Sequence, residues 1–334
     1  MSYLYVCEQG ASIGLADNRF QVKYKDGMIS SIPAETLEMI EVFGKVNVTT
    51  ACIEECLKRG GNMLFYSTNG AYYGRLISTT HVNVHRQRKQ ADIEHDLNFK
   101  TAIAKKIIAA KIHNQIVILR RYARNGSLDI SRSIVEMQNM QNKVMHAGSD
   151  EQIMGYEGTA AKIYFNVLGQ LIDPTFSFRG RSRRPPMDPF NSLISLGYSI
   201  MLNEIYGKIE GKGLNPYFGI LHKDREKHPT LASDLMEEWR AVLVDSTALS
   251  VLNGHELSVD DFYSGVEQPG VFLTKDAFKK YIRKLEGKFR TDSKYLDYID
   301  YRVSFRRAID YQIGQFVKAV ENHEPEEYHP IVIR

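Results

Sequence analysis

Hydrophobic and polar residues alternate with a period of two along the first 80 residues, which is the period of a half-buried β-strand. Asp26 and Gly27 supply a hairpin signal between two of these runs. A short helix is predicted at 50–59, where Gly60 and Gly61 end it. Strands are predicted at 3–6, 12–15, 20–24, 40–43, 46–48, 62–66 and 72–77. The pattern therefore predicts a small β-rich domain at the N-terminus.

From about residue 90 the hydrophobic period lengthens to 3.6 and stays helical through most of the remaining chain. Helices are predicted at 92–124, 131–146, 189–209, 231–252, 274–288 and 298–321, and another begins at the cap residue Ser149. Residues 321–327 are polar and predict a loose tail. The predicted fold class is α+β, with a small β-rich N-terminal domain at 1–85 and a larger all-α domain at 86–334.

Composition excludes several classes of protein. The 43 basic residues barely outnumber the 40 acidic ones, so affinity for nucleic acid must come from local basic patches. The three cysteines form no disulfide framework or zinc motif, and Cys52 and Cys56 share a helical face as buried apolar groups. No apolar run approaches the ~20 residues that cross a bilayer, and residues 1–8 do not resemble a signal peptide. These features predict a cytoplasmic protein that makes no membrane contact.

Glu157 lies on the apolar stripe of the helix that follows Ser149, where Ile153, Ala160 and Tyr164 share its face. An ionised carboxylate facing a core costs several kcal/mol unless it is paired, protonated or bound to a metal. Two interpretations follow. Solvent or an arginine satisfies Glu157 near the start of the helix, or the carboxylate binds a ligand.

A second group of polar residues lies about 65 residues further on. His222 follows an apolar run, and Asp234 and Glu237 lie three apart on one face of the next predicted helix. If the fold brings these residues to Glu157, carboxylates and one imidazole would suit Mg²⁺ or Mn²⁺. The alternatives are a satisfied, partly buried histidine and a solvated first helical turn.

Four arginines, Arg179, Arg181, Arg183 and Arg184, fall within six residues between the two groups. A guanidinium binds phosphate oxygens through two parallel N–H groups, so this segment is a candidate for contacts with DNA phosphates. A solubilising loop is the alternative. Pro189 opens the next predicted helix, which makes Asp188 a candidate cap beside Asn191 and gives both a structural role.

Four motifs in order along the whole chain resemble those of the CRISPR-associated spacer-acquisition integrases, the larger of the two universal adaptation proteins. They are Tyr156-Glu157-Gly158-x-Ala160-Ala161; Arg183-Arg184-Pro185-Pro186-x-Asp188-Pro189-x-Asn191 with Leu193 to Tyr198; Gly219-x-Leu221-His222; and Leu231-Ala232-x-Asp234-Leu235-x-Glu237 with Arg240 and Asp245. Any one of them is a weak signal, whereas four in the family order are specific.

The resemblance implies a metal-dependent DNA endonuclease that inserts short DNA fragments into a CRISPR array. Its metal ligands and catalytic residues fall on Glu157, His222 and Glu237, with Asp234 in the same site, and the metal is Mg²⁺ or Mn²⁺. It also implies binding of double-stranded DNA, a homodimer joined through the β domains and a small second adaptation protein as partner. Two other functions share parts of this pattern: a stand-alone nuclease for branched DNA and a non-catalytic DNA scaffold.

Overall fold

A computed structural model describes residues 2–124, 126, 128–182, 185–265, 269–294 and 299–334, and these form two compact units that divide between Val82 and Asn83. The division falls three residues before the boundary predicted from the hydrophobic pattern. The first unit is rich in strands and the second is mainly helical, so the predicted α+β class is confirmed.

The N-terminal unit contains two four-stranded sheets, with strand orders β1-β5-β7-β8 and β4-β3-β2-β6. Gly27 adopts the positive φ that the turn between β3 and β4 requires. The elements are β1 Ser2–Val6, β2 Ser12–Ala16, β3 Arg19–Lys23, β4 Ile29–Pro33, η1 Ala34–Thr36, β5 Leu37–Phe43, β6 Asn47–Val48, α1 Thr50–Lys58, β7 Asn62–Tyr66 and β8 Tyr72–Leu76.

The core of this unit is built from the inward positions of both sheets and from α1. Ile13, Phe20 and Ile40 are buried in one hydrophobic cluster together with Cys52 and Cys56. Burial raises the pKa of the Cys52 thiol to about 12 and that of Cys56 to about 11. Both cysteines are thus protonated apolar groups at neutral pH, as their spacing on a helix predicts.

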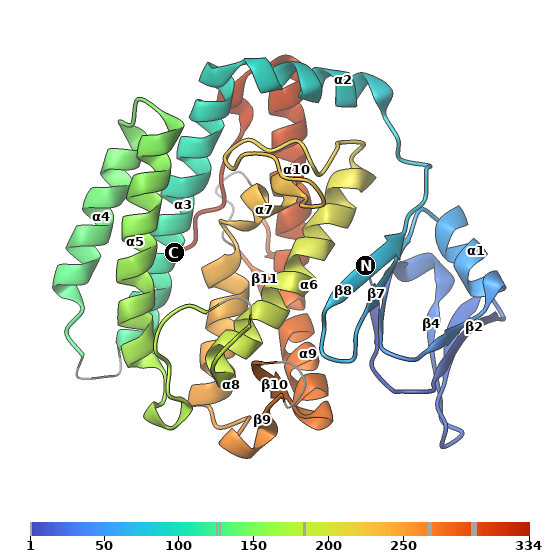
Figure 1. Cartoon of the computed structure of the whole chain (residues 1–334). Helices are drawn as coiled ribbons and strands as arrows, with labels where there is room; N and C mark the ends of the chain where they lie inside the picture. The colour runs from blue at the N-terminus through green and yellow to red at the C-terminus, as the bar shows by residue number, and fades with distance from the viewer. Residues whose placement is uncertain (1, 125, 127, 183–184, 266–268, 295–298) are drawn as a thin grey trace. The chain divides into compact units, whose positions relative to one another are not determined.

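The C-terminal unit is built mainly from helices (Figure 1). Its elements are α2 Val84–Asp92, η2 Ile93–His95, α3 Leu97–Ala123, α4 Ser131–Met145, α5 Asp150–Leu171, η3 Pro174–Phe176, α6 Pro189–Gly211, α7 Thr230–Met236, η4 Arg240–Asp245, α8 Ser246–Asn253, η5 Val259–Asp261, β9 Phe262–Ser264, β10 Val271–Leu273, α9 Lys275–Arg290, β11 Asp292–Ser293, β12 Val303–Ser304, α10 Phe305–Asn322 and η6 Pro325–Glu327. The η4 segment is a π-helix, and the other η segments are short 3-10 helices.

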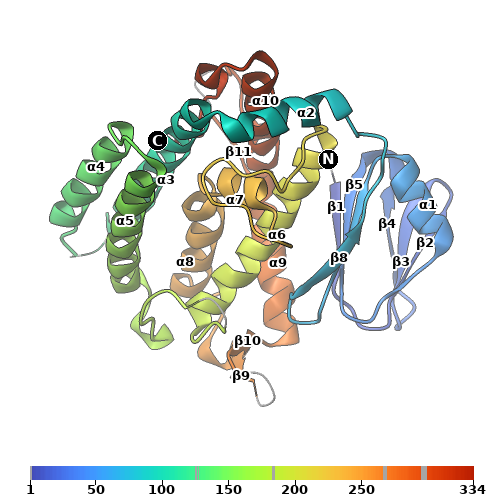
Figure 2. The ribbon, with the colours of Figure 1, turned by 45° about the horizontal axis from the view of Figure 1, so that its top comes forward.

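The helices α3, α4 and α5 pack side by side (Figure 2), and α3 also contacts η4. The helix α6 packs against α7, η4 and α8, so α3 and α6 both contact the η4 segment. Almost every side chain from Thr230 to Asp245 is buried between these helices. A segment that carries several acidic residues therefore lies inside the unit.

Three expectations for this unit are wrong in detail. Two short ribbons, β9 with β10 and β11 with β12, interrupt the predicted all-α region. The helix predicted at 231–252 is divided into α7, η4 and α8. The tail predicted to be loose is held by ion pairs from Glu321 to Arg86 at 2.6 Å and from Glu326 to Lys106 at 2.8 Å.

Among the residues described, no helix combines the length and the apolar character that crossing a membrane requires.

Candidate active site

Glu157 lies in the second turn of α5, whose first turn is capped by the Ser149 hydroxyl accepting from the Gln152 N–H. Ile153, Ala160 and Tyr164 are fully buried on the same helix, and the Glu157 side chain is 16% exposed. The Glu157 carboxylate therefore lies at the edge of the hydrophobic core. Solvent alone does not satisfy it, because Glu157 Oε1 accepts a very short hydrogen bond from Lys111 Nζ.

Lys111 comes from the middle of α3 and joins two acidic residues. Its Nζ also lies 2.7 Å from Glu237 Oε2, so one ammonium bridges carboxylates from α5 and from the end of α7. Burial of Lys111 would lower its pKa, but the charges of Glu237 and Glu157 outweigh burial and leave the pKa raised. Lys111 is therefore cationic in this cluster.

Glu237 is the residue that ends α7, and it is almost completely buried. Arg240 Nε lies 3.0 Å from Glu237 Oε2, and its guanidinium stacks on Tyr198 with 4.6 Å between Cζ and the ring centroid. Burial favours protonation of Glu237, yet the charges of Arg240 and Lys111 dominate and lower its pKa to about 2. Glu237 is consequently ionised at neutral pH.

Asp234 orients His222 and does not join the bridged carboxylates. The completely buried carboxylate accepts backbone N–H bonds from Ile220 at 2.8 Å, Leu221 at 2.9 Å and His222 at 3.3 Å. His222 Nδ1 lies 2.6 Å from Asp234 Oδ1, and this hydrogen bond raises the pKa of His222 against the effect of burial. The imidazole thus points its Nε2 away from Asp234.

His222 lies near Glu237, because the charges of Glu237 and Lys111 shift its pKa in opposite directions. The structure brings Glu157 and Glu237 together at Lys111 from segments that are far apart in the sequence, and it links His222 to Asp234, three residues before Glu237. It places Asp234 behind His222, with both of its oxygens already occupied.

Glu238 faces the opposite way from Glu237. Its carboxylate accepts from the Tyr328 hydroxyl at 2.5 Å and from the Ile331 N–H at 2.6 Å, inside the unit. Burial raises the pKa of Glu238 to about 8 despite these donors. The rotation of about 100° between consecutive helical residues explains why Glu238 has other partners than Glu237.

Asp245 forms a second buried polar group next to Arg240. It accepts hydrogen bonds from the Tyr164 hydroxyl at 2.8 Å and from the Tyr198 hydroxyl at a very short distance. Burial raises the pKa of Asp245 to about 6, with the two tyrosines and Arg240 opposing it. Tyr198 therefore has a structural contact on each side, with its hydroxyl on Asp245 and its ring under Arg240.

The arginine segment lies beside α5. Arg179 is exposed, and together with Arg181 and Lys162 it lines a cavity of about 840 Å³ against α5. Arg181 also donates to Asn191 Oδ1 at 2.7 Å, so its guanidinium is partly committed to the start of α6. Lys162 is five residues beyond Glu157 on α5, a rise of about 7.5 Å and a rotation of about 140°, so the cavity is close to the acidic cluster along the helix but lies on a different side of it.

The other predicted residues of this segment divide into two groups. Asp188 is the N-cap of α6 and accepts from the Asn191 N–H at 2.8 Å. The Asn191 amide donates to Gly180 O at 2.8 Å and to Asp188 Oδ2 at 2.6 Å, which ties the arginine segment to the helix. Both are structural residues here. Arg183 and Arg184 lie outside the described residues.

The donor set fits a hard divalent cation in its chemistry. The carboxylates of Glu157 and Glu237 meet at a cation, the Lys111 ammonium, and the nearby His222 has its Nδ1 held by Asp234, so that Nε2 is the nitrogen available to a metal. Within the described part of the chain, no three acidic, histidine or cysteine side chains converge closely enough to hold a metal ion in this conformation. A metal bound by Glu157 and Glu237 would take the position of the Lys111 ammonium.

Sequence reasoning missed Lys111 entirely and gave Arg240 and Asp245 no role. A signal for Lys111 was present, because it interrupts the apolar stripe of α3 between the buried residues Ile107 and Ile118. A lysine on one core-facing stripe and a glutamate on another are natural candidates for a pair.

Comparison with known proteins agrees with the motifs and the fold. The model of the family described as CRISPR associated protein Cas1 matches residues 4–287. The CRISPR-associated endonuclease Cas1 of Mycobacterium tuberculosis is 37% identical over 326 residues, covering 97% of this chain and 96% of that protein.

Solved structures share the architecture. A Cas1 protein from Thermotoga maritima superposes with a TM-score of 0.81 and 23% identity over 96% of this chain and 97% of that one. A chain of a Cas6-RT-Cas1–Cas2 complex superposes with a TM-score of 0.83 and 25% identity over 98% of this chain and 36% of the longer chain. The resemblance inferred from the four motifs is confirmed, and the chain belongs to the Cas1 family of CRISPR-associated proteins.

Proposed function

We propose that this protein is the nuclease and integrase of CRISPR adaptation, and that Glu157, His222 and Glu237 hold the Mg²⁺ or Mn²⁺ on which its reaction depends. The observation that carries the proposal is the convergence of Glu157 and Glu237 on a single cation, Lys111, beside a histidine whose Nδ1 is fixed by Asp234. When bound, the metal supplies a Lewis acid for a phosphoryl oxygen.

The reaction is phosphoryl transfer without a covalent protein intermediate. A 3′-hydroxyl of a short DNA fragment attacks a phosphodiester in the CRISPR array, a new P–O bond forms, and the bond to the leaving DNA oxygen breaks. The attacking hydroxyl loses a proton and the leaving oxygen gains one. With water as the attacking group, the same centre hydrolyses the phosphodiester.

The surrounding side chains have distinct tasks in this proposal. Asp234 keeps the His222 ring oriented, so that Nε2 binds the metal or handles the proton. Arg240 holds Glu237 ionised and fixes its position. The Lys111 ammonium neutralises Glu157 and Glu237 in the protein without metal, and it lies close enough to the cluster to interact with the phosphate charge that gathers in the transition state.

Arg179 and Arg181 contact the DNA backbone along the cavity beside α5. The partners proposed are double-stranded DNA, a second copy of the chain joined through the β-rich unit, and the small adaptation protein Cas2. The similarity to a Cas1 chain within a complex that contains Cas2 supports the last of these.

The test compares Glu157→Gln with Glu151→Gln, an exposed residue in the first turn of the same helix. Joining of a short duplex with free 3′-hydroxyls to a supercoiled, repeat-bearing plasmid is measured in Mg²⁺ and in Mn²⁺, with and without Cas2. We expect Glu157→Gln to lose joining and hydrolysis while DNA affinity stays within about twofold, and Glu151→Gln to behave as wild type. Unchanged joining by Glu157→Gln overturns the assignment of the site.

A further inference from the structure

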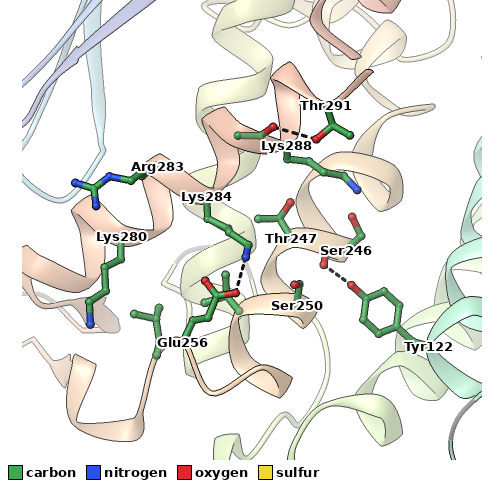
Figure 3. Close-up of a pocket in the computed structure, with 13 residues that line it drawn as sticks. Tyr122, Ser246, Thr247, Ser250, Glu256, Lys280, Arg283, Lys284, Lys288 and Thr291 are labelled. Atoms are coloured by element: carbon green, nitrogen blue, oxygen red, sulfur yellow. Dashed lines mark hydrogen bonds and ion pairs between the residues drawn. The ribbon is translucent and has the colours of Figure 1, made fainter. Parts of the chain in front are cut away.

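A basic cavity of about 520 Å³ lies between the end of α3, α8 and α9 in the C-terminal unit (Figure 3). It is separate from the acidic cluster and from the cavity that Arg179 lines. Its walls are Tyr122, Ser246, Thr247, Ser250, Val251, Glu256, Leu257, Lys280, Arg283, Lys284, Gly287, Lys288 and Thr291. Cations and hydroxyl groups thus make up most of its polar surface.

The cations come from one helix. Lys280, Arg283, Lys284 and Lys288 recur at the three- and four-residue spacing that places side chains on one face of α9. Among the described residues of the lining there is one carboxylate, Glu256, whose Oε1 lies 2.5 Å from Lys284 Nζ. Three cations of the lining therefore have no acidic partner among these described residues.

Lys288 is the most buried of these cations. Its Nζ lies 5.3 Å from the centroid of the Phe305 ring, and no carboxylate of the described residues forms an ion pair with it. Burial, with a smaller effect of the Arg121 charge, lowers the pKa of Lys288 to about 8. A bound anion would stabilise the charged form of this lysine.

Ser250 adds a hydroxyl to the same wall, whereas Thr247 and Thr291 already donate to the carbonyls of Leu243 and Gly287. The donors available to a ligand are therefore mainly ammonium and guanidinium groups. Such a set recognises phosphate by charge and has little means of reading a base.

The helix α3 relates this cavity to the acidic cluster. Tyr122, on the cavity wall, is eleven residues beyond Lys111, which corresponds to about 16 Å along the helix and a rotation of about 20°. The two residues therefore lie on the same face of α3, but Asn114 and Ile118 between them are buried, so a strand that reaches both places would pass outside this face. Because phosphates of one strand are spaced about 3.4 Å along a duplex, a separation of about 16 Å corresponds to at least five nucleotides.

The length of the basic row favours a polymer over a single phosphate. From Lys280 to Lys288 the rise along α9 is about 12 Å, which matches three or four consecutive phosphates of one strand. We propose that this cavity binds the backbone phosphates of the DNA strand at least about five nucleotides from the phosphate that reacts at Glu157 and Glu237. The proposal rests on the proposed function and adds a second point of contact for the same DNA.

The test uses Lys280→Gln combined with Arg283→Gln, since both side chains are exposed and their replacement leaves the core intact. Lys318→Gln, an exposed lysine of α10, is the matched control. Duplexes that extend three or ten base pairs beyond the reacting phosphate are bound to full-length protein at several salt concentrations. For the wild-type protein, the affinity for each duplex and the joining of each duplex are both measured.

For the long duplex we expect the double variant to bind about tenfold more weakly at 0.1 M salt. We also expect its slope of log K against log[salt] to fall by about 1 to 2, because about 0.9 is lost for each phosphate contact. Binding of the short duplex and all binding by Lys318→Gln should match wild type. Lys288→Gln should lower the affinity for the long duplex in the same way, which tests whether the buried end of the row also contacts the strand.

Two outcomes overturn the proposal. Equal salt slopes for the double variant and wild type on the long duplex show that the cavity does not contact the strand. Competition by ATP or inorganic triphosphate that depends on Lys280 and Arg283, with unchanged DNA binding, assigns the cavity to a small anion. If wild-type protein joins DNA normally, either result refutes only the DNA contact in this cavity and not the proposed function. If wild-type protein neither joins nor cleaves DNA, the proposed function itself is refuted.

Discussion

Replacing Lys111 by methionine tests the acidic cluster directly. The substitution keeps most of the aliphatic stem and removes the ammonium that bridges Glu157 and Glu237. Removing one partner of a buried ion pair costs about 3 to 5 kcal/mol, because the remaining charge is left uncompensated. Arg240 still contacts Glu237, so in the absence of metal we expect the free energy of unfolding to fall by about 3 kcal/mol, the lower end of this range.

The same variant should bind Mn²⁺ more tightly than wild type, because the ion no longer displaces an ammonium. We expect roughly a tenfold gain in affinity, equivalent to about 1.4 kcal/mol. In EDTA the melting temperature should fall by about 6 to 12 °C, at about 2 to 4 °C for each kcal/mol. Saturating Mn²⁺ should then raise the melting temperature of the variant more than that of wild type.

Differential scanning calorimetry and titration calorimetry provide both measurements. The control is Lys100→Met on the same helix, whose ammonium lies 2.7 Å from the half-exposed Glu94 and whose loss should cost less than about 1 kcal/mol. If Lys111→Met is as stable as wild type in EDTA, or if Mn²⁺ stabilises both proteins equally, the ammonium and the metal do not compete for the same oxygens.

Three further predictions concern the supporting residues. Asp234→Asn should lower the pKa of His222 in NMR titrations and reduce the free energy of unfolding by about 1 to 3 kcal/mol, since the amide replaces a charged acceptor; an unchanged His222 titration would contradict the contact. In wild type, Asp245 takes up a proton on folding because its pKa rises from near 3.8 to about 6, so the free energy of unfolding should decline, by up to about 3 kcal/mol, as pH rises from 4 to 6. Urea unfolding of Asp245→Asn should lack this decline, and an identical slope would show that Asp245 titrates normally. Arg306→Met should lower the free energy of unfolding by about 3 to 5 kcal/mol in chemical denaturation, because the buried Glu204 loses its partner and Glu286 keeps only Arg290, while Arg290→Met at the surface should lower it by less than about 1 kcal/mol.

The hydrophobic pattern predicts the elements well where one period persists. The alternation up to residue 80 predicts strands that overlap β1 to β3 and β5 to β8, whereas β4 follows only the hairpin signal at Asp26 and Gly27, and Ser149 predicts the start of α5. The prediction from the hydrophobic pattern fails between Thr230 and Asn253, where a single helix was expected. There the buried carboxylates of Asp234, Glu237 and Asp245 must reach partners in different directions, and the π-helix η4 changes the angular register between them.

In the candidate site, too, sequence patterns identify single residues, whereas the contacts between them depend on packing. Glu157 is recognisable in the sequence because it interrupts an apolar stripe, and His222 and Glu237 because of their motifs. That Glu157 and Glu237 meet at Lys111 depends on how α3 packs against α5 and η4, which no local pattern contains. The exposure of Arg179 and the commitment of Arg181 to Asn191 likewise follow only from packing.

The two consecutive glutamates at the end of α7 limit the repulsion that an anionic substrate meets. Glu237 has a pKa of about 2 and is ionised at neutral pH, whereas Glu238, with a pKa of about 8, is mostly protonated. The dipeptide therefore contributes one negative charge to the local electrostatic potential, although its formal charge is two. Of these two glutamates, a polyanion approaching the cluster therefore meets the charge of Glu237 alone, while the uncharged Glu238 stabilises the fold through Tyr328 and Ile331.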